Sequence, residues 1–237
     1  MRRAGQVVRE VLELVRSKVK PGATTLDLEK AAEARLTELG VKAAFKGYHG
    51  FPCVLCTSVN SEVVHGIPSP KRVLKEGDIV SVDFGVVVDG YYGDAAITVP
   101  VGEKIDPDTA RLLAVTERSL HAGIAAVRPG ATLGDVGAAV QGVVEAEGFS
   151  VVRDFVGHGI GVHMHEDPQV PNFGLPGRGM KLRTGMVIAI EPMVNAGKAD
   201  VQVLGDGWTA VAADGSMSAH FEHTVAVTAT GARVLTE

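Results

Sequence analysis

The chain has 237 residues, of which 46% are hydrophobic and 22% are charged, a balance that is ordinary for a globular protein with a substantial core. Its formal net charge of −5 argues against a protein whose main task is to bind nucleic acid. No apolar run reaches the roughly 18 residues that a membrane-spanning helix needs, and we expect a cytoplasmic protein.

The N-terminal segment predicts an amphipathic helix. Its valines and leucine recur at helical spacing: Val7, Val8, Val11, Leu12, Val15 and Val19. Glu10 and Glu13 lie inside the segment and argue against a signal peptide. The early arginines leave a mitochondrial presequence as the alternative.

The two cysteines, Cys53 and Cys56, form a C-x-x-C pair in the segment PCVLCTSV. A zinc site would need a second pair, which the chain lacks. A redox pair usually lies at a helix N-terminus, whereas this β-branched, apolar segment predicts a strand. Packing or a place in a pocket wall is therefore favoured, with redox chemistry as the alternative.

An internal repeat organises the chain. Two pairs of segments align without gaps at the same shift of 108 residues: 19–40 with 127–148, and 75–85 with 183–193. The shift superposes Asp83 on Glu191. Two copies are too few for a solenoid. They predict two similar halves about a pseudo-twofold axis, approximately 1–108 and 109–237, within a single domain that spans 1–237.

Each half predicts a helix, a turn, a second helix and then strands. In the first half the second helix follows Pro21-Gly22, with Thr24 and Asp27 as a weak capping box and Gly40 at its end. The matching signals in the second half are Pro129, Gly130, Thr132 and Gly148. Strands are predicted over 53–59, 79–88, 95–99, 151–156, 186–191, 201–204 and 208–212, followed by a hairpin that turns at Thr230-Gly231. Long helices with mostly antiparallel strands indicate the α+β class.

Five side chains with oxygen or nitrogen donors lie in or beside short, apolar, strand-like runs: Asp83, Asp94, His158, Glu191 and Glu222. Buried carboxylates are costly, since two like charges about 4 Å apart repel by roughly 4 kcal/mol at an effective dielectric constant of about 20. Four carboxylates that converge on one point would need cations to neutralise them. Oxygen ligands with one imidazole suit Mn, Fe, Co or Zn.

The segment between Asp83 and Asp94 predicts a tight hairpin with Asp89-Gly90 at its turn, in which the two aspartates face each other on adjacent strands. Because the repeat makes Asp83 and Glu191 equivalent, the pseudo-twofold axis would bring them towards a common centre. For any one of these acidic residues alone, a surface, capping or buried ion-pair role is the alternative.

Histidines mark three further segments. The run GHGIGVHMH at 157–165 has glycines that let the backbone approach a metal ion or substrate, and no helix follows that would make it a phosphate site. We exclude His163 from the site, because a step in strand register turns it to the face opposite His158. His65, in VVHGIP, reads by itself as a loop histidine, and Glu222 has His220 and His223 nearby.

Seven motifs, in this order, resemble the type I methionine aminopeptidases: GYHGFP, EVVHGIP, GDIVSVDFG, DGYYGDAA, GHGIGVHMHEDPQVPN, MVIAIEPM and FEHTVAVT. The resemblance runs from about Arg2 to Thr228, nearly the whole chain. It implies the pita-bread fold of the M24 metallopeptidases, an α+β domain whose pseudo-twofold halves have an antiparallel sheet covered by helices. The sequence shows no zinc-finger extension and no long insertion in its C-terminal half, which resembles the short bacterial type. It departs from the family pattern in starting at the first helix, without the usual short N-terminal lead.

The resemblance implies a dinuclear-metal aminopeptidase that removes the initiator methionine from nascent proteins when the second residue is small. Asp83 would chelate one of two divalent ions (Co, Mn, Fe or Zn), and Asp94 and Glu222 would bridge both. His158 and Glu191 would complete the other ion's ligands. Glu191 would also act as the general base and then as the general acid.

The resemblance also assigns the substrate site. His65 and His165 would contact the scissile peptide and stabilise the tetrahedral intermediate, each by about a few kcal/mol. The methionine pocket would be lined by Tyr48, Phe51, Cys56 and Trp208, with Phe45 nearby. One departure from the family pattern is Met164, which stands where an aromatic residue usually precedes the second histidine.

The expected partners are peptide and nascent-chain N-termini, with a transient ribosome contact, no membrane and no specific nucleic acid, and we expect a monomer. Two alternatives remain open. One is an Xaa-Pro aminopeptidase of the same fold, although those enzymes usually carry a large N-terminal domain. The other is a non-catalytic relative that binds ribosomes or RNA, although such proteins lose ligands and this chain keeps all five.

Overall fold

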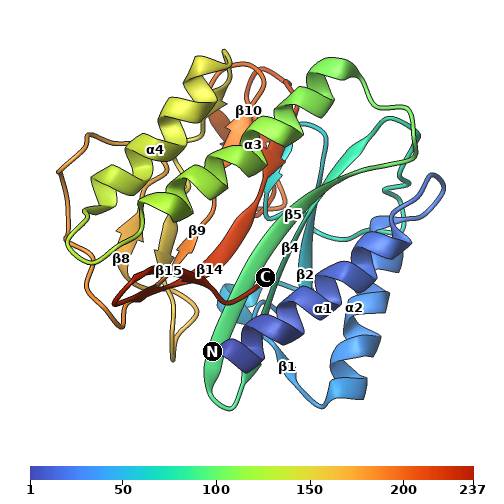
Figure 1. The fold of residues 1–237 in the computed structure, drawn as a ribbon. Coiled ribbons are helices and arrows are strands. Elements are labelled where there is room, and N and C mark those ends of the chain that lie inside the picture. Colours follow the sequence, from blue (N-terminus) through green and yellow to red (C-terminus); the bar gives the residue numbers. More distant parts are fainter.

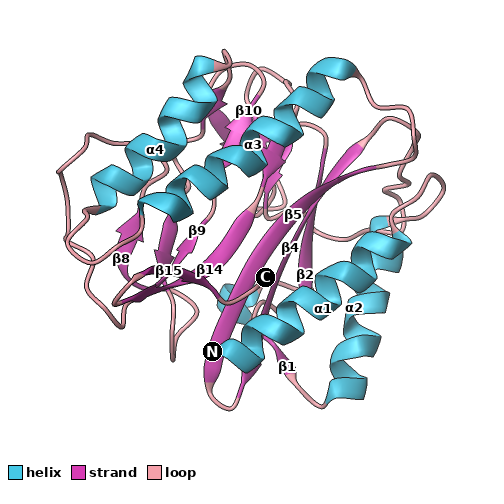
Figure 2. Ribbon diagram, viewed as in Figure 1, coloured by secondary structure: helices cyan, strands magenta, loops and turns pink.

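Two pairs of helices cover one antiparallel sheet in a computed structural model that describes residues 1–237 (Figures 1 and 2). The helices are α1 (Arg2–Lys18), α2 (Thr25–Leu39), α3 (Pro107–Ala126) and α4 (Leu133–Ala146), with a short 3-10 turn at Tyr48–Gly50. The strands of the first half are β1 (Lys42–Ala43), β2 (Leu55–Val59), β3 (Glu62–Val64), β4 (Ile79–Val88) and β5 (Tyr91–Pro100). Those of the second half are β6 (Ser150–Val151), β7 (Gly157–Gly159), β8 (Glu166–Val170), β9 (Val187–Ile190), β10 (Met193–Asn195), β11 (Val201–Val203), β12 (Ala210–Ala212), β13 (Ser218–His220), β14 (Glu222–Thr228) and β15 (Gly231–Val234).

The main sheet has nine strands and runs through both halves. Its order is β1-β4-β5-β14-β9-β7-β8, with β15 on β14 and β2 on β4, and every pair is antiparallel. The pairing of β5 with β14 joins the first half to the second. Two three-stranded sheets, β13-β10-β6 and β11-β12-β3, flank it. The predicted α+β class is confirmed.

The helices α2 and α4 begin with equivalent capping boxes. The hydroxyl of Thr24 accepts from the Asp27 amide at 3.2 Å, and the Asp27 carboxylate accepts from the Thr24 amide at 2.8 Å. Thr132 and Asp135 form the same pair of bonds at 3.2 and 2.7 Å. Both predicted boxes are therefore present, and Gly40 ends α2 with a left-handed φ of 65°.

The 108-residue repeat also appears in backbone contacts. An isolated bridge joins Thr24 to Val73 in the first half and Thr132 to Lys181 in the second. Both residues of the second bridge lie 108 positions after those of the first. The two halves therefore share the contact that ties the start of the helix to the segment before the main strand.

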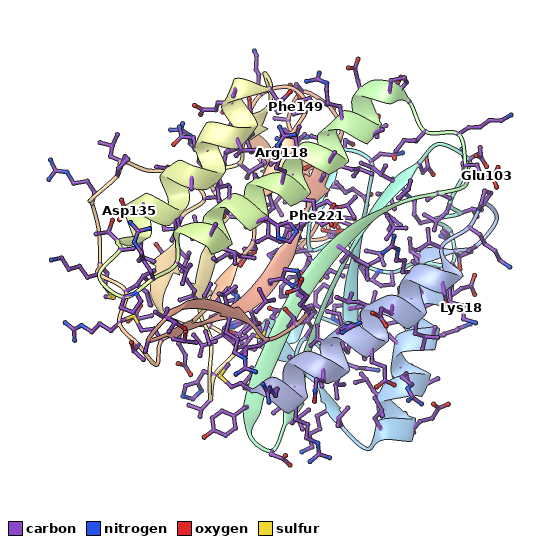
Figure 3. All side chains as sticks on the ribbon, viewed as in Figure 1. Lys18, Glu103, Arg118, Asp135, Phe149 and Phe221 are labelled. Carbon is purple, nitrogen blue, oxygen red and sulfur yellow. The ribbon has the colours of Figure 1, made fainter.

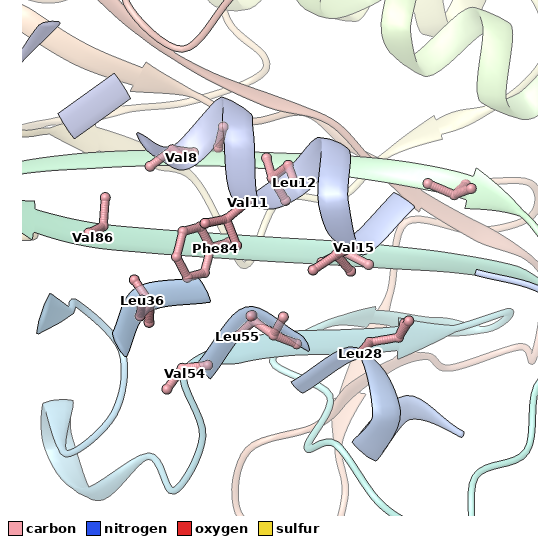
Figure 4. Packing of buried hydrophobic residues seen from close by; sticks show 14 of the residues in the cluster. Val8, Val11, Leu12, Val15, Leu28, Leu36, Val54, Leu55, Phe84 and Val86 are labelled. Atoms are coloured by element: carbon pink, nitrogen blue, oxygen red, sulfur yellow. The ribbon is translucent and has the colours of Figure 1, made fainter. Parts of the chain in front are cut away.

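Each half has its own hydrophobic core. In the first half, α1 lies against β4 and β5, with its Val8, Val11 and Val15 fully buried near Phe84 of β4 (Figure 4). The helix α2 packs on α1 and β2. A second cluster of 20 buried residues lies under α3 and α4. Charged side chains such as Lys18 and Glu103 project outward (Figure 3). The predicted amphipathic helix is confirmed, although Val19 lies just beyond its end.

Some predicted strands are shorter in the structure. The strand expected over 151–156 ends at Val151, because the exposed charged residues Arg153 and Asp154 follow in a loop. The strand expected over 208–212 begins at Ala210, since the amides of Trp208 and Thr209 donate to Asp206 in a turn. The C-terminal hairpin is confirmed, with Thr228 opposite Gly231.

No helix in the structure combines the length and the apolar composition that crossing a bilayer requires.

Replacing Thr24 with alanine removes the capping hydroxyl and should cost about 1 kcal/mol of folding free energy, a loss of about 2–4 °C in Tm for a chain of this size. Thr132→Ala should have a similar effect, because the box is equivalent. Thr37→Ala is the matched control, since Thr37 is exposed and lies away from the helix start. Equal shifts for Thr24→Ala and Thr37→Ala in thermal unfolding would contradict the capping role.

Candidate metal centre and adjoining pocket

The five predicted metal ligands lie on five strands that are consecutive neighbours in the main sheet. In sheet order, β4 carries Asp83, β5 carries Asp94, β14 begins with Glu222, Glu191 directly follows β9, and β7 carries His158. Neighbouring strands lie about 4.8 Å apart, so one side chain from each can reach a common point. Residues far apart in the chain therefore meet because of strand order.

The two aspartates are diagonal neighbours, which corrects the expectation that they face each other. Asp83 pairs with Ala96, and Asp94 pairs with Gly85. The two-residue offset keeps both aspartates on one face of the sheet, because side chains alternate with a period of two. The predicted turn is present, with Asp89 and Gly90 both at positive φ (51° and 79°).

The ligand atoms converge closely. Nε2 of His158 lies 3.5 Å from Oε1 of Glu191 and 3.9 Å from Oδ2 of Asp94. Atoms of Asp94, His158 and Glu222 all lie within 4.8 Å of one another. Asp83 belongs to the same site through its contact with Asp94.

Burial and mutual repulsion disfavour the charged form of these carboxylates. Burial raises the pKa of Asp83 to about 7. The pKa of Asp94, Glu191 and Glu222 is well above the ordinary range. Burial is the larger cause, and the charges of neighbouring carboxylates are the second. Burial lowers the pKa of His158 to about 4, so its imidazole is neutral at pH 7 and can act as a ligand.

Buried atoms without a partner show that the site fits a cation. Of the seven buried side-chain nitrogen and oxygen atoms that make no hydrogen bond, four belong here: Asp83 Oδ1, Asp94 Oδ1, Glu222 Oε1 and His220 Nε2. A buried polar atom without a partner is unfavourable. Carboxylate oxygens with imidazole nitrogens are the donor set of Mn, Fe, Co and Zn. The residues present therefore suit divalent cations.

His220 is the residue that the sequence left unassigned. Its side chain is 1% exposed, and its Nε2 lies 3.7 Å from Oε2 of Glu191, the oxygen that does not face His158. The sequence feature that could have identified His220 is its position two residues before Glu222, because on an extended chain this spacing puts both side chains on one face. His223 points elsewhere and contacts Thr236 through its Nδ1 at 2.9 Å.

A cavity of about 430 Å³ opens onto these carboxylates. Its walls include every predicted site residue: the five candidate ligands together with Tyr48, Phe51, Cys56, His65, His165 and Trp208. Phe45 and Met164 also line the cavity, as does His49, which the sequence did not single out. The structure thus brings the candidate ligands and the candidate pocket residues into one cavity.

Aromatic and sulfur-containing side chains form the apolar wall. The rings of Phe51 and Trp208 meet edge to face with centroids 5.1 Å apart. Met164 is 2% exposed and packs with Phe45, Phe51 and Cys56, so a thioether completes the wall where the family pattern has a ring. The wall is therefore apolar, with aromatic rings at some positions and a flexible thioether at Met164.

His165 links the apolar wall to the candidate ligands. Its Nδ1 lies 2.8 Å from the hydroxyl of Tyr48, and its ring centroid lies 4.2 Å from that of His158. Burial lowers the pKa of His165, which favours a neutral imidazole.

His65 is held in a left-handed backbone conformation with φ of 62°. The following residue, Gly66, accepts a hydrogen bond from the Thr57 amide of β2 at 2.8 Å. A Cβ at position 66 would come within 2.1 Å of the Thr57 carbonyl oxygen, so only glycine permits this contact. Non-glycine residues at positive φ occur at functional sites when the surroundings fix them. Burial lowers the pKa of His65 to about 4.

His163 and the two cysteines lie outside the candidate metal-ligand set. His163 is absent from the cavity, as expected, but the reason was wrong, because His163 lies in an exposed bend and not on a strand. Cys53 precedes β2 and Cys56 lies within it. Burial raises the pKa of both thiols, to about 11 for Cys53, which disfavours redox chemistry.

The chain is similar over its full length to methionine aminopeptidases. It is 52% identical over 236 residues to the methionine aminopeptidase of Clostridium perfringens (strain 13 / Type A), covering 100% of this chain and 94% of the relative. The crystal structure of methionine aminopeptidase from Thermotoga maritima matches with a TM-score of 0.98 and 51% identity, covering 100% of this chain and 95% of the other.

More distant structures share the fold. The prolidase from Pyrococcus horikoshii OT3 matches with a TM-score of 0.78 at 20% identity, and covers 100% of this chain and 60% of the prolidase. These likenesses confirm the predicted pita-bread architecture. The sequence pattern described as "Metallopeptidase family M24" matches residues 1–229. A chain that matches this pattern over nearly its whole length, with converging carboxylates on five adjacent strands, belongs to the metallopeptidase family M24.

Proposed function

We propose that this chain is a methionine aminopeptidase that removes the N-terminal methionine from peptides and nascent proteins when the second residue is small. The observation that carries the proposal is that the converging carboxylates and an apolar pocket share one cavity. Residues from both halves line it, which supports a single catalytic domain over 1–237. The full-length identity of about half to curated methionine aminopeptidases points to the same activity.

The proposed cofactor is a pair of divalent ions, Co, Mn, Fe or Zn. Asp83 would hold one ion, Asp94 and Glu222 would bridge both, and His158 and Glu191 would hold the other. Bound divalent ions polarise a carbonyl oxygen and lower the pKa of water towards neutrality. The unpartnered oxygens of Asp83, Asp94 and Glu222 support this assignment.

Glu191 is the proposed proton carrier. Its two oxygens lie beside two imidazoles, 3.5 Å from His158 and 3.7 Å from His220, which restrict how the carboxylate can turn. Burial raises its pKa, and a carboxyl group with a raised pKa can hold a proton near neutral pH and release it again. Glu191 would take the proton from the attacking water and give it to the nitrogen of the leaving amine.

His65 and His165 are the proposed contacts for the scissile peptide. Both imidazoles are favoured in the neutral form, so each can donate one N–H to the carbonyl oxygen as charge develops there. If the hydroxyl of Tyr48 donates to Nδ1 of His165, the proton of that ring is on Nε2. The ring of His65 packs edge to face against Phe155 with centroids 5.5 Å apart, and this contact limits how the ring can turn.

The apolar wall suits a methionine side chain. Thioether–aromatic contacts contribute about 0.3–1.5 kcal/mol each, and Phe51 and Trp208 offer two rings at one side of the cavity. Met164 and Cys56 add polarizable sulfur to the same cavity lining. The flexible thioether of Met164 can adapt to neighbours, so this pocket would tolerate unbranched analogues of methionine.

The two alternatives receive less support. The similarity to a prolidase is at 20% identity, against 52% to a methionine aminopeptidase, and shows the fold alone. A non-catalytic relative would not need five donor side chains on adjacent strands around a cavity. The cytoplasmic location, the monomeric state and a transient ribosome contact stay predictions of this proposal.

The metal-loaded protein should release methionine from a methionine–alanine–serine peptide at least roughly 100-fold faster than it cleaves an alanine–proline–serine peptide, because a side-chain pocket discriminates on this scale. The free amino acid is measured after incubation with Mn²⁺ or Co²⁺. Absence of methionine release with either ion would contradict the proposal, and faster cleavage of the alanine–proline peptide would favour the Xaa-Pro alternative.

In the same peptide assay, Asp94→Asn tests the metal-ligand assignment, because it keeps the shape of the side chain and removes its charge. It should lose more than about 100-fold in activity, because a ligand of the bound ions is weakened. Its metal-free form should be at least as stable as the wild type, since one of four mutually repelling carboxylates becomes neutral.

The metal-free protein should lose stability as the pH rises from about 6.5 to 8.5. In the lower part of this window, up to about pH 7, the folded state retains a proton on Asp83 that the unfolded chain has already released, so the free energy of unfolding falls with pH. The raised pKa values of Asp94 and Glu222 act in the same direction. The buried histidines, whose pKa values are lowered, act in the opposite sense only below about pH 6.5.

Thermal unfolding with a chelator, and then with Mn²⁺, measures this effect. Mn²⁺ should raise Tm more at the higher pH, because metal binding requires deprotonated carboxylates. Asp94→Asn should show a weaker pH dependence. A metal-free Tm that is constant over the window and unaffected by Mn²⁺ would contradict the metal-site assignment.

A further inference from the structure

The strand β2 presents one edge that no other strand covers by ladder pairing. It pairs with β4 along its other edge, through Cys56 opposite Asp83 and the residues on either side. Every second backbone amide of β2 points towards this open edge and would lack a hydrogen-bond partner there. Buried backbone N–H groups without partners are unfavourable. The chain satisfies them with other groups.

Two carboxylates and one carbonyl accept these hydrogen bonds. Glu29 of α2 accepts from the Val54 amide at 2.8 Å and from the Leu55 amide at 3.2 Å, one with each oxygen. The Thr57 amide donates to the carbonyl of Gly66 at 2.8 Å. At the far end, Glu62 accepts from the Val59 amide at 2.6 Å. Glu29 and Glu62 therefore perform the same chemistry at opposite ends of one edge.

Glu29 is an unusual choice for this position. It is 5% exposed and takes part in no salt bridge, so burying its charge is costly. The two hydrogen bonds from backbone amides offset that cost. Burial raises its pKa, while the two backbone amides act in the opposite direction and favour the carboxylate. An apolar side chain here would leave both amides unpaired.

The second half of the repeat does not use a carboxylate at this place. The residue 108 positions after Glu29 is Gly137 of α4, and a Cβ there would come within 2.4 Å of the carbonyl oxygen of Phe173. In that half the helix packs directly against backbone carbonyls. The fold unit therefore does not require Glu29, which occurs only in the half that supplies Phe51 and Cys56 to the cavity.

The backbone that Glu29 holds lies between two walls of the cavity. Phe51 precedes the anchored amides of Val54 and Leu55, and Cys56 follows them. Cys56 also pairs with Asp83, so β2 contacts the candidate metal site as well as the pocket. A shift at Val54 and Leu55 would move Phe51 and Cys56, whereas the bond from β2 to Gly66, beside His65, is made by a different residue, Thr57.

We propose that Glu29 is a positioning residue for the methionine pocket, whose carboxylate fixes the backbone at Val54 and Leu55 and so sets where Phe51 and Cys56 stand. The inference rests on the proposed function, because it assigns the pocket to methionine. It adds a specificity determinant on a helix that does not line the cavity.

The test compares Glu29→Gln and Glu29→Ala with Glu62→Gln in the metal-loaded, full-length protein. The side-chain amide in Glu29→Gln can accept from one backbone N–H but presents its own NH₂ to the other, and alanine accepts from neither. KM for the methionine–alanine–serine peptide should rise about tenfold in Glu29→Gln, equivalent to about 1.4 kcal/mol, and further in Glu29→Ala, with kcat within about twofold. Preference for methionine over leucine should fall in parallel.

Glu62→Gln is the matched control, since it weakens an equivalent amide bond on the same edge but Glu62 does not line the cavity. It should lower Tm without changing KM or the preference for methionine. If Glu29→Gln also lowers Tm alone, with KM and preference unchanged, Glu29 is only structural and the inference is wrong. If Glu29→Ala fails to fold, the milder variant Glu29→Gln is compared with Glu62→Gln alone.

Thiol reactivity gives a readout that does not depend on catalysis. In a Cys53→Ser background, the rate constant of the Cys56 thiolate, obtained from the pH dependence of its reaction with iodoacetamide, should rise about tenfold when Glu29→Gln is added, because the freed backbone opens more often. Comparing thiolate rate constants removes the direct effect of the Glu29 charge on the pKa of Cys56. Glu62→Gln should leave this rate unchanged. If wild-type protein releases no methionine, the proposed function fails while this rate still tests Glu29. An unchanged rate in Glu29→Gln would overturn the inference.

Discussion

Repulsion among four buried carboxylates is the constraint on which the rest of this structure depends. Asp83, Asp94, Glu191 and Glu222 converge from neighbouring strands, three of them with an oxygen that has no hydrogen-bond partner. A stable fold that keeps such a cluster needs compensation, which cations supply most directly. The two separate cores give the rigid support that holds the carboxylates together against this repulsion.

The duplication explains how the chain forms this cluster. Each half supplies the same unit, a capped helix tied by a bridge to the segment before a main strand, and Asp83 and Glu191 occupy equivalent places. The halves diverge where function requires it. The first half adds Glu29 and most of the pocket wall, whereas the second half has Gly137 at the place of Glu29 and packs its helix on carbonyl oxygens.

Much of the fold and the site could be predicted from sequence because the signals were local or repeated. The caps at Thr24 and Thr132 and the turn at Asp89-Gly90 depend on a few neighbouring residues, and the 108-residue shift links Asp83 to Glu191 by residue spacing alone. Features that depend on long-range register were missed. The diagonal offset of the aspartates, the approach of His220 to Glu191 and the reach of Glu29 to β2 follow from packing between distant segments.

Anomalous diffraction from crystals equilibrated with Mn²⁺ near pH 8 tests the central claim most directly. The account predicts two anomalous peaks about 3.5–4 Å apart, surrounded by Asp83, Asp94, His158, Glu191 and Glu222, with Asp94 and Glu222 between the two ions. No peak among these five side chains, with Mn²⁺ bound elsewhere or not at all, would contradict it.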